Sequence, residues 1–399
     1  MRELARADRA AWPEAVDLHG PYLGFSGMDN TTRSLAKALA GLGVALGLVD
    51  LPHWSAARLP AGARDPWFDA IAGPVGAALA VHLCMPHQLR PRRGQRTVNF
   101  TMFEATPAPS SWIAAGRRAD VTVLPTEAAR EAWIAAGADP ERLRLCPLGV
   151  DAARFRPGHA ALPLGPVRGR PVADFAVRFL NVSDIVPRKN LLGLLRVWLS
   201  ATAAEDDAVL LLKLSHGRGS SVQFLRDLQR LEAALGRPRD RAAPILIFDD
   251  VLSDADLPRL YATATHYWSL SHGEGWDQPM TEAGATGLRL IAPDHTAYRS
   301  YLTPEHATLI PAREEPVPSV ENADIRAFFE GARWWRPDED AAAEAIRTAI
   351  ERRDPAVTAR ARLAERFGWD RSAARLLDIL AELPPPGRGL TAWMRLPWQ

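Results

Sequence analysis

The strongest indication of the fold is the segment SHGEGWDQPMTEA, residues 271–283, in the second half of the chain. Gly273 and Gly275 flank a glutamate there, so the backbone can approach a ligand closely. The residues that follow, 281–287, predict the first turns of a helix. A loop that runs into the start of a helix is an anion-binding unit, because exposed N–H groups and the positive end of the helix dipole attract negative charge.

Two glutamates in this stretch are suited to the groups on either side of a bound diphosphate. Glu282, on the predicted helix, can accept hydrogen bonds from a ribose, and Glu274, in the loop, can accept them from a sugar. The spacing alone is weak evidence, because two glutamates eight positions apart can equally be solvated side chains without a role. The residues around them make the stronger case.

The sequence over 254–301 resembles the donor-binding region of retaining GT-B glycosyltransferases of family 4. That family carries Glu-Gly-Phe-Gly, a proline, a second glutamate and a helix of small residues, and the matching residues are Glu274, Gly275, Trp276, Pro279, Glu282 and 283–287. The resemblance implies that Glu274 lies near the donor sugar and that Glu282 binds the ribose, with further donor contacts from Gly275, Trp276, Asp277 and Gln278. Asp277 stands where the family usually has glycine, and it adds a negative charge beside the expected diphosphate.

A second segment, NVSDIVPRKN at 181–190, follows a predicted strand and precedes an amphipathic helix over 191–202. In the family, an arginine and a lysine after this strand neutralise the diphosphate. Lys189 matches the lysine, Asp184 occupies the arginine position, and Arg188 is placed to supply the missing charge. A leaving nucleoside diphosphate needs such cations when no metal assists it. The alternative is a solvated Pro-Arg-Lys loop.

The first half contributes weaker signals. Gly24 and Gly27 lie in GFSGM, ahead of a helical run over 31–42, and this resembles the GT-B loop under the donor phosphates; taken alone, it is a turn before a helix.

Residues 101–151 resemble the rest of the family's first domain, with Glu104 at a strand end that faces the cleft. His82, with His87 as a second candidate, is our prediction for a catalytic histidine in the cleft; the alternative is a structural histidine.

Short apolar runs alternate with helical patterns in both halves, which predicts parallel sheets covered by helices. The predicted strands are 45–51, 77–83, 97–103 and 121–125, then 179–182, 208–214, 244–248, 266–270 and 289–292. A segment rich in Pro, Gly and Arg, 155–172, has the composition of a linker. Residues 369–383 predict a last helix, which in GT-B chains crosses back over the cleft.

We therefore predict an α/β protein of the GT-B fold, with two Rossmann-like domains facing each other across a cleft. An N-terminal acceptor-side domain covers 1–160, a C-terminal donor domain covers 161–368, and a closing helix and tail cover 369–399. The tail carries Arg388, Trp393, Arg395 and Trp398, a composition that also occurs at membrane interfaces, so weak peripheral membrane contact is one partner prediction.

The bulk composition limits the class of protein. The 48 Lys and Arg against 47 Asp and Glu leave a net charge of +1, which gives no electrostatic case for nucleic acid. Cys84 and Cys146 form neither a disulfide framework nor a zinc cluster. Residues 1–17 lack the apolar core of a signal peptide, and no apolar run is long enough to span a membrane. We expect a cytoplasmic protein.

The predicted function is the transfer of a sugar, with retention, from a UDP- or GDP-linked donor to a hydroxyl acceptor on a glycan, lipid or protein. Such an activity belongs to polysaccharide or glycoconjugate synthesis, and no cofactor or metal is expected. Retention is implied by the resemblance alone. Two alternatives share the fold: a sugar-nucleotide epimerase or phosphorylase, and a non-catalytic sugar-nucleotide-binding subunit, the latter because of Asp184 and Asp277.

Overall fold

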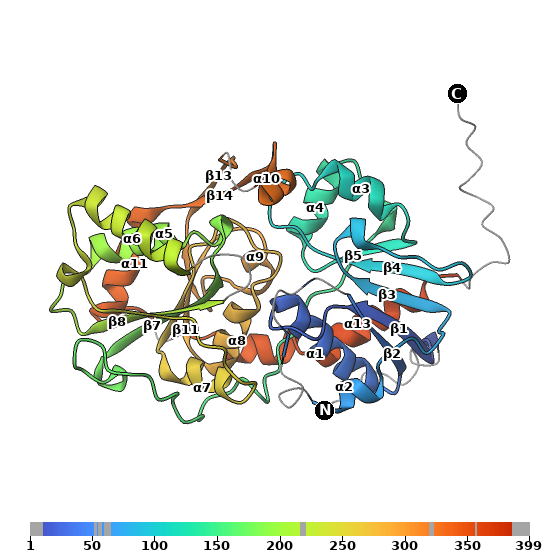
Figure 1. Ribbon diagram of the computed structural model, residues 1–399, viewed down its shortest axis with the longest axis horizontal. Helices are drawn as coiled ribbons and strands as arrows, with labels where there is room; N and C mark the ends of the chain where they lie inside the picture. Colours follow the sequence, from blue (N-terminus) through green and yellow to red (C-terminus); the bar gives the residue numbers. More distant parts are fainter. Residues whose placement is uncertain are drawn as a thin grey trace.

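Six parallel strands form the sheet of the N-terminal half of the computed structural model (Figure 1), in the order β2-β1-β3-β4-β5-β6. The structure describes residues 11–51, 54, 58–59, 65–215, 221–318, 323–355 and 357–384. The strands are β1 (Ala15–Gly20), β2 (Ala45–Asp50), β3 (Leu79–Leu83), β4 (Arg96–Phe100), β5 (Val121–Leu124) and β6 (Leu143–Leu145). Between them lie α1 (Gly27–Gly41), α2 (Trp67–Ala70), η3 (Pro86–Gln88), α3 (Ser110–Gly116), α4 (Glu127–Ala135) and η4 (Pro140–Arg142).

The C-terminal half repeats this architecture, with six parallel strands in the order β9-β8-β7-β10-β11-β12. The strands are β7 (Val177–Asp184), β8 (Ala208–Ser215), β9 (Ile245–Phe248), β10 (His266–Trp268), β11 (Arg289–Pro293) and β12 (Thr308–Ile310). The helices are η5 (Val172–Asp174), η6 (Pro187–Lys189), α5 (Leu191–Ala201), α6 (Ser221–Leu235), η7 (Arg239–Arg241), α7 (Asp256–Thr263), α8 (Gln278–Thr286), α9 (Tyr298–Tyr301), α11 (Glu339–Ile350) and α12 (Arg360–Arg366).

The strand order of this second sheet positions the site. It is the doubly wound order 3-2-1-4-5-6, in which the direction of winding reverses between the first and fourth strands, here β7 and β10. Open α/β sheets bind ligands outside the carboxyl ends of the strands at that reversal. The loops that leave β7 and β10 are the two segments that carry Lys189 and Glu274.

The central strands are buried on both faces, which explains their sequences. In β8, AVLLLKLS, Leu210, Leu211 and Leu212 are fully buried, as in parallel strands covered by helices on each side. The helix α5 lies over this sheet and packs against α11. Their apolar residues form a hydrophobic core of the C-terminal half that includes Trp198 and Trp268.

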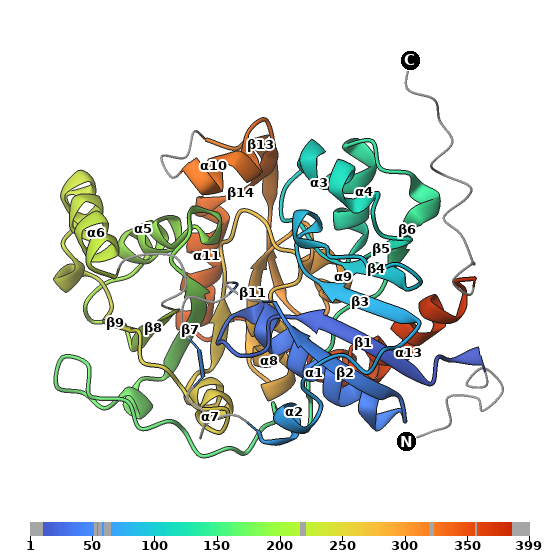
Figure 2. The same cartoon turned by 45° about the vertical axis from the view of Figure 1, so that its right-hand side comes forward.

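The last described helix, α13 (Trp369–Ala381), returns to the N-terminal half, as predicted. It packs against α1, as Figures 1 and 2 both show, whereas α12, which directly precedes it in the chain, packs against α8 of the C-terminal half. Its amphipathic sequence buries Leu376, Leu377 and Leu380, while Oγ of Ser372 donates to the carbonyl of Pro147 at 2.7 Å. The two halves are therefore joined by a second crossing of the chain.

One element is absent from the prediction: a two-stranded antiparallel sheet of β13 (Ala312–Pro316) and β14 (Arg333–Pro337), with α10 (Ala323–Phe329) between them. It projects from the C-terminal half between β12 and α11 and reaches α3 and α4 of the N-terminal half (Figure 2). Its sequences, AREEP and RWWRP, show neither apolar alternation nor a continuous apolar run.

The nine predicted strands are confirmed, with shifts at their ends. The strand predicted over 97–103 ends at Phe100, and the residues after it leave the sheet, with Met102 beside Gly275 of the C-terminal half. The prediction omits β1, whose sequence AVDLHG places the polar Asp17 and His19 among apolar residues, and also β6 and β12, which have only three residues each. The predicted domain boundary between 160 and 161 falls in the connection from β6 to β7 and stays a prediction.

None of the described helices is both long enough and apolar enough to span a bilayer. The tail that carries Arg388, Trp393, Arg395 and Trp398 lies outside the described residues. The prediction of peripheral membrane contact through that tail therefore stays a prediction.

Candidate functional site

Two cations lie on the loop that leaves β7. The short helix η6 begins at Pro187 and carries Arg188 and Lys189. Asn190 ends it in the left-handed conformation, with φ at 50°, and its Nδ2 atom donates to the carbonyl of Leu270 at 2.9 Å. Because Leu270 follows β10, this bond ties the two loops of the winding reversal together and turns both cations towards the second loop.

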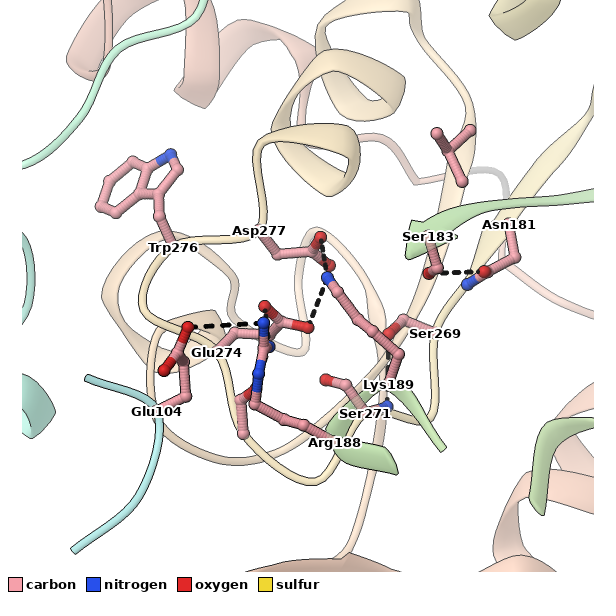
Figure 3. A network of polar contacts seen from close by, with 12 residues as sticks. Glu104, Asn181, Ser183, Arg188, Lys189, Ser269, Ser271, Glu274, Trp276 and Asp277 are labelled. Carbon is pink, nitrogen blue, oxygen red and sulfur yellow. Dashed lines mark hydrogen bonds and ion pairs between the residues drawn. The ribbon is translucent and has the colours of Figure 1, made fainter. Parts of the chain in front are cut away.

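Glu274, on the second loop, binds both cations (Figure 3). Its Oε2 atom lies 2.7 Å from Nη1 of Arg188, and its Oε1 atom lies 2.7 Å from Nζ of Lys189. The side chain is only 4% exposed. Burial alone would raise the pKa of Glu274, but the charges of Arg188 and Lys189 lower it below its usual value. Glu274 is therefore a buried, ionised carboxylate.

Two more carboxylates complete the charged cluster, which consists of Glu104, Arg188, Lys189, Glu274 and Asp277. Oδ1 of Asp277 lies 3.3 Å from Nζ of Lys189, and Oε1 of Glu104 lies 3.4 Å from Nη2 of Arg188 (Figure 3). Burial raises the pKa of Asp277 although Lys189 opposes the shift. Three carboxylates and two cations leave one net negative charge when all are ionised. Since Glu104 belongs to the N-terminal half, the cluster spans both halves.

Asp277 occupies the start of α8. It precedes the helix in the left-handed conformation, with φ at 64°, and its Oδ2 atom accepts a hydrogen bond of 2.8 Å from the hydroxyl of Tyr298. Ser269 and Ser271 contact the same hydroxyl at 2.8 and 3.0 Å. The carboxylate of Asp277 is therefore held rigidly at the positive end of the helix dipole, where an anion is stabilised.

Glu282, one turn further along α8, faces the N-terminal half. Its Oε2 atom accepts a hydrogen bond of 2.7 Å from the hydroxyl of Tyr261, and Nδ2 of Asn30 lies 3.5 Å from Oε1. The same Asn30 amide donates to Oε1 of Gln278 at 2.9 Å, and Nε2 of Gln278 donates to Oγ1 of Thr31 at 2.8 Å. The helices α1 and α8 thus meet across the cleft. Burial raises the pKa of Glu282 to about 7.

The glycine loop before α1 binds an anion of its own chain. The N–H groups of Gly24 and Ser26 donate to the carboxylate of Asp29 at 2.7 and 3.0 Å, and Ser26 caps the helix that begins at Gly27. We expected these N–H groups to meet the donor phosphates. In the structure the loop adjoins Asn30 and the cleft, but two of its donors are already bound to Asp29.

The glycines of the second loop serve the contact between the halves. A Cβ atom at Gly273 would lie 1.9 Å from the carbonyl oxygen of Glu104, and one at Gly275 would lie 2.6 Å from Sδ of Met102. The close approach that we expected from a ligand is therefore made by the N-terminal half. Both glycines let the residues after β4 reach the charged cluster.

Two predicted site residues lie elsewhere. The indole of Trp276 is buried against Tyr301 and Phe367, at ring-centroid distances of 5.1 and 5.7 Å, and Figure 3 shows it pointing away from Lys189. The ring belongs to the hydrophobic core, because burial of an indole is worth more there than in a polar cleft. His82 stacks on His19 at 4.2 Å, and among the described residues no contact joins it to the charged cluster. Burial lowers the pKa of His82 to about 3, so its ring is neutral at ordinary pH.

The structure thus gathers Arg188, Lys189, Glu274 and Asp277 in one network and places Gln278 and Glu282 beside it, facing α1. Sequence reasoning missed the residues that hold these groups: Asn30, Tyr261 and Tyr298. One signal was available, since Tyr298 and Tyr301 are three positions apart, as residues on one face of a helix are. The hydroxyl of Tyr301 donates to the carbonyl of Trp276 at 2.8 Å. Both tyrosines therefore support the second loop.

The arrangement suits a phosphate ester with a polar group on each side. Arg188 and Lys189 are charge-assisted donors next to the start of α8. The carboxylate of Glu274 lies on one side of them, and that of Glu282 lies further along α8. In the part of the chain that the structure describes, no group of three or more His, Cys, Asp or Glu side chains is arranged to hold a metal ion.

The sequence matches no protein-family model, and no curated protein is significantly similar to it. Solved structures are similar in fold. HepE of Anabaena, in complex with UDP and glucose, has a TM-score of 0.62 at 14% identity, with 93% of this chain and 100% of HepE covered. Sucrose-phosphate synthase of Thermosynechococcus elongatus has a TM-score of 0.62 at 16% identity, with 92% and 98% covered. A glycosyltransferase of Rickettsia africae has a TM-score of 0.60 at 13% identity, with 92% and 97% covered. Such likenesses establish the fold.

Proposed function

We propose that this chain, which has the GT-B fold, is a glycosyltransferase that takes its sugar from a nucleoside diphosphate. The observation that carries the proposal is the pair of buried cations, Arg188 and Lys189, next to the start of α8 at the winding reversal of the C-terminal sheet. The comparison with HepE supports it, because HepE structures hold UDP and UDP-glucose. The donor is a UDP- or GDP-linked hexose.

The donor lies along α8 and the second loop in this proposal. Glu282 accepts hydrogen bonds from the ribose, and Gln278 contacts the donor beside it. Lys189 and Arg188 bind the diphosphate, which replaces carboxylates as their partner. Glu274, released from the cations, then accepts a hydrogen bond from a hydroxyl of the sugar. Charge-assisted bonds to a phosphate and to a carboxylate are of similar strength, so this exchange of partners is feasible.

The reaction needs no further protein acid. The acceptor hydroxyl attacks the anomeric carbon from the side of the leaving group, the bond from that carbon to the phosphate oxygen breaks, and its electron pair stays on the phosphate. The acceptor proton passes to the departing phosphate. Because the new bond forms on the face that the leaving group departs from, the configuration is retained. Arg188 and Lys189 stabilise the charge that develops on the leaving diphosphate. The acceptor, a hydroxyl of a glycan, lipid or protein, approaches from the N-terminal half.

One observation favours a second candidate, a sugar-nucleotide-binding subunit that transfers nothing. The carboxylates of Asp277 and Glu104 give the charged cluster a net negative charge, which opposes binding of a diphosphate. A chain that binds sugar nucleotides weakly and undergoes no turnover would fit these contacts. The transferase remains our proposal because the structures of similar fold include enzymes, among them sucrose-phosphate synthase and a glycosyltransferase of Rickettsia africae.

Two measurements test the proposal. Thermal unfolding is followed with UDP, GDP, ADP and dTDP and with their sugar conjugates, because a ligand of the native state raises the melting temperature by mass action. Release of free nucleoside diphosphate is then measured with and without a mixture of hydroxyl acceptors. Release that depends on an acceptor supports the transferase. Protection without release supports the binding subunit, an epimerised donor without acceptor supports an epimerase, and no protection by any nucleotide contradicts all three.

A further inference from the structure

The strand β14 is hydrogen-bonded to both halves of the molecule. The N–H of Arg333 donates to the carbonyl of Thr106 at 2.7 Å, and the N–H of Thr106 donates to the carbonyl of Arg333 at 2.9 Å. Two residues further along, the N–H of Trp335 donates to the carbonyl of His272 at 2.8 Å, and Nδ1 of His272 donates to the carbonyl of Trp335 at 2.8 Å. Thr106 belongs to the N-terminal half and His272 to the loop after β10.

These bonded residues are close in sequence to two carboxylates of the charged cluster. Thr106 follows Glu104 by two positions, and His272 precedes Glu274 by two positions. Glu104 and Glu274 bind the same guanidinium group, that of Arg188, at 3.4 and 2.7 Å. The carbonyl of Arg188 also accepts a 2.8 Å bond from the N–H of His272. Short segments therefore link β14 to each side of Arg188.

The side chains of β14, like its backbone, contact both halves of the molecule. Neighbouring residues on a strand point to opposite faces. Trp334, 4% exposed, stacks on His272 of the loop after β10 at a ring-centroid distance of 4.5 Å and also belongs to the hydrophobic cluster that contains Phe103 of the N-terminal half. Trp335 stacks on His295 of the C-terminal half at a ring-centroid distance of 5.9 Å. Trp334 thus joins the two halves, and Trp335 attaches the hairpin to the C-terminal half.

We propose that β14 positions the two carboxylates around Arg188 and holds the halves at the separation the reaction needs, with Trp334 as the positioning residue. The strand is hydrogen-bonded to the N-terminal half through Arg333 and to the C-terminal half through Trp335. The spacing of these two residues therefore fixes the distance between Glu104 and Glu274. Loss of Trp334 removes the side chain that joins the N-terminal cluster to His272, while Trp335 keeps the hairpin on the C-terminal half. The cleft then opens, and Arg188 loses Glu104 as a partner. The catalytic consequence rests on the proposed function; the structural one does not.

The first test measures the separation of the halves by energy transfer between dyes on two introduced cysteines. Glu131 on α4 and Gln229 on α6 are exposed positions in the two halves, and the native Cys84 and Cys146 are buried, so they do not compete for the dyes. Trp334→Ala is expected to lower the transfer efficiency and broaden its distribution in the protein without nucleotide. Trp334→Phe, which keeps an aromatic anchor, is expected to restore both.

A second variant covers the case in which Trp334→Ala does not fold. Arg333→Pro removes the N–H that donates to Thr106 at the first residue of β14, a position that tolerates proline, and leaves the buried side chains intact. The same loss of transfer efficiency, smaller in size, is expected. Unchanged efficiency in both variants overturns the proposal.

Kinetics separate this inference from the proposed function. If the wild type transfers sugar, Trp334→Ala is expected to lower kcat/KM by about tenfold or more, because small misplacements at a reacting centre have large effects on rate. Trp334→Phe is expected to stay within about threefold of the wild type. A wild type without transferase activity whose Trp334→Ala variant still opens contradicts the proposed function only. Normal kcat/KM and normal energy transfer in Trp334→Ala contradict the positioning role.

Discussion

Oδ1 of Asp277 lies 3.3 Å from Nζ of Lys189, so the chain places a carboxylate of its own on a cation that we assign to the donor diphosphate. The same carboxylate lies at the start of α8, the second favourable place for an anion. Asp277 therefore competes with a bound diphosphate in two ways: it occupies Lys189, and it repels the phosphate charge.

Replacing Asp277 by asparagine is expected to tighten donor binding. Asparagine tolerates the left-handed backbone at this position, and its Oδ1 atom still accepts the bond from Tyr298. The Kd for the best nucleotide sugar, measured by calorimetry, is expected to fall by about tenfold, which corresponds to about 1.4 kcal/mol. Asp207→Asn is the control, because Asp207 is 54% exposed at the opposite edge of the same sheet. Weaker binding by Asp277→Asn would show that Asp277 assists the donor.

Removing the other member of this pair is expected to destabilise the protein. Lys189 is buried between Glu274 and Asp277, and Lys189→Met leaves both carboxylates without their shared cation. Breaking one side of a buried ion pair costs about 3–5 kcal/mol in the free energy of unfolding. Urea denaturation measures this loss. In the double variant with Asp277→Asn, part of the loss is expected to return, and strictly additive effects would indicate that the two residues do not interact.

The sequence predicted most of the fold because buried parallel strands have continuous apolar runs, as β8 does. The family resemblance also implied that Lys189 meets the donor diphosphate and Glu274 the donor sugar, and in the structure the two side chains lie together. The sequence did not predict that Glu274 binds Lys189 itself, because the identity of a side chain's partner depends on distances that spacing does not encode. The same reason explains why Asp29, two residues after Gly27 of the expected phosphate loop, was not considered as its anion.

The position of Trp276 could not be predicted for another reason. The motif places an aromatic residue beside Glu274, and the sequence does not state which way the ring turns. In the structure the ring packs on Phe367, which precedes α13 and lies 91 positions away in the chain. The hairpin of β13 and β14 escaped prediction because its strands are stabilised by contacts with both halves rather than by a pattern of their own. Long-range contacts of this kind are visible only in the folded chain.

The two glycines beside Glu274 are expected to respond differently to substitution. In Gly273→Ala the new Cβ would meet the backbone carbonyl of Glu104 at 1.9 Å, which only a movement of the whole wall can relieve. In Gly275→Ala the nearest atom is Sδ of Met102, at the flexible end of a side chain. We expect Gly273→Ala to lower kcat/KM by about 100-fold and Gly275→Ala by less than about tenfold, because only the first displaces the cluster. Equal losses would contradict this reading of the interface.

The buried carboxyl of Glu282 links stability to pH. Its pKa rises from 4.5 to about 7, chiefly through burial. Between these values the folded protein holds a proton that the unfolded chain has released, so protons stabilise the folded state in that window. Stability therefore falls as the pH rises from 4.5 to 7, and the loss persists above pH 7.

Replacing Glu282 by glutamine removes this dependence, because the amide cannot ionise and its oxygen still accepts the bond from Tyr261. With each pKa unit equivalent to 1.36 kcal/mol, the free energy of unfolding of Glu282→Gln relative to the wild type is expected to rise by about 3 kcal/mol between pH 4.5 and pH 8. Urea denaturation at pH 5, 6, 7 and 8 measures the trend. Glu127→Gln, at a 51% exposed side chain on α4, is the matched control and should show no such rise. A constant difference between Glu282→Gln and the wild type at every pH would mean that Glu282 is already ionised in the folded protein, and that its place between α1 and α8 is open to water.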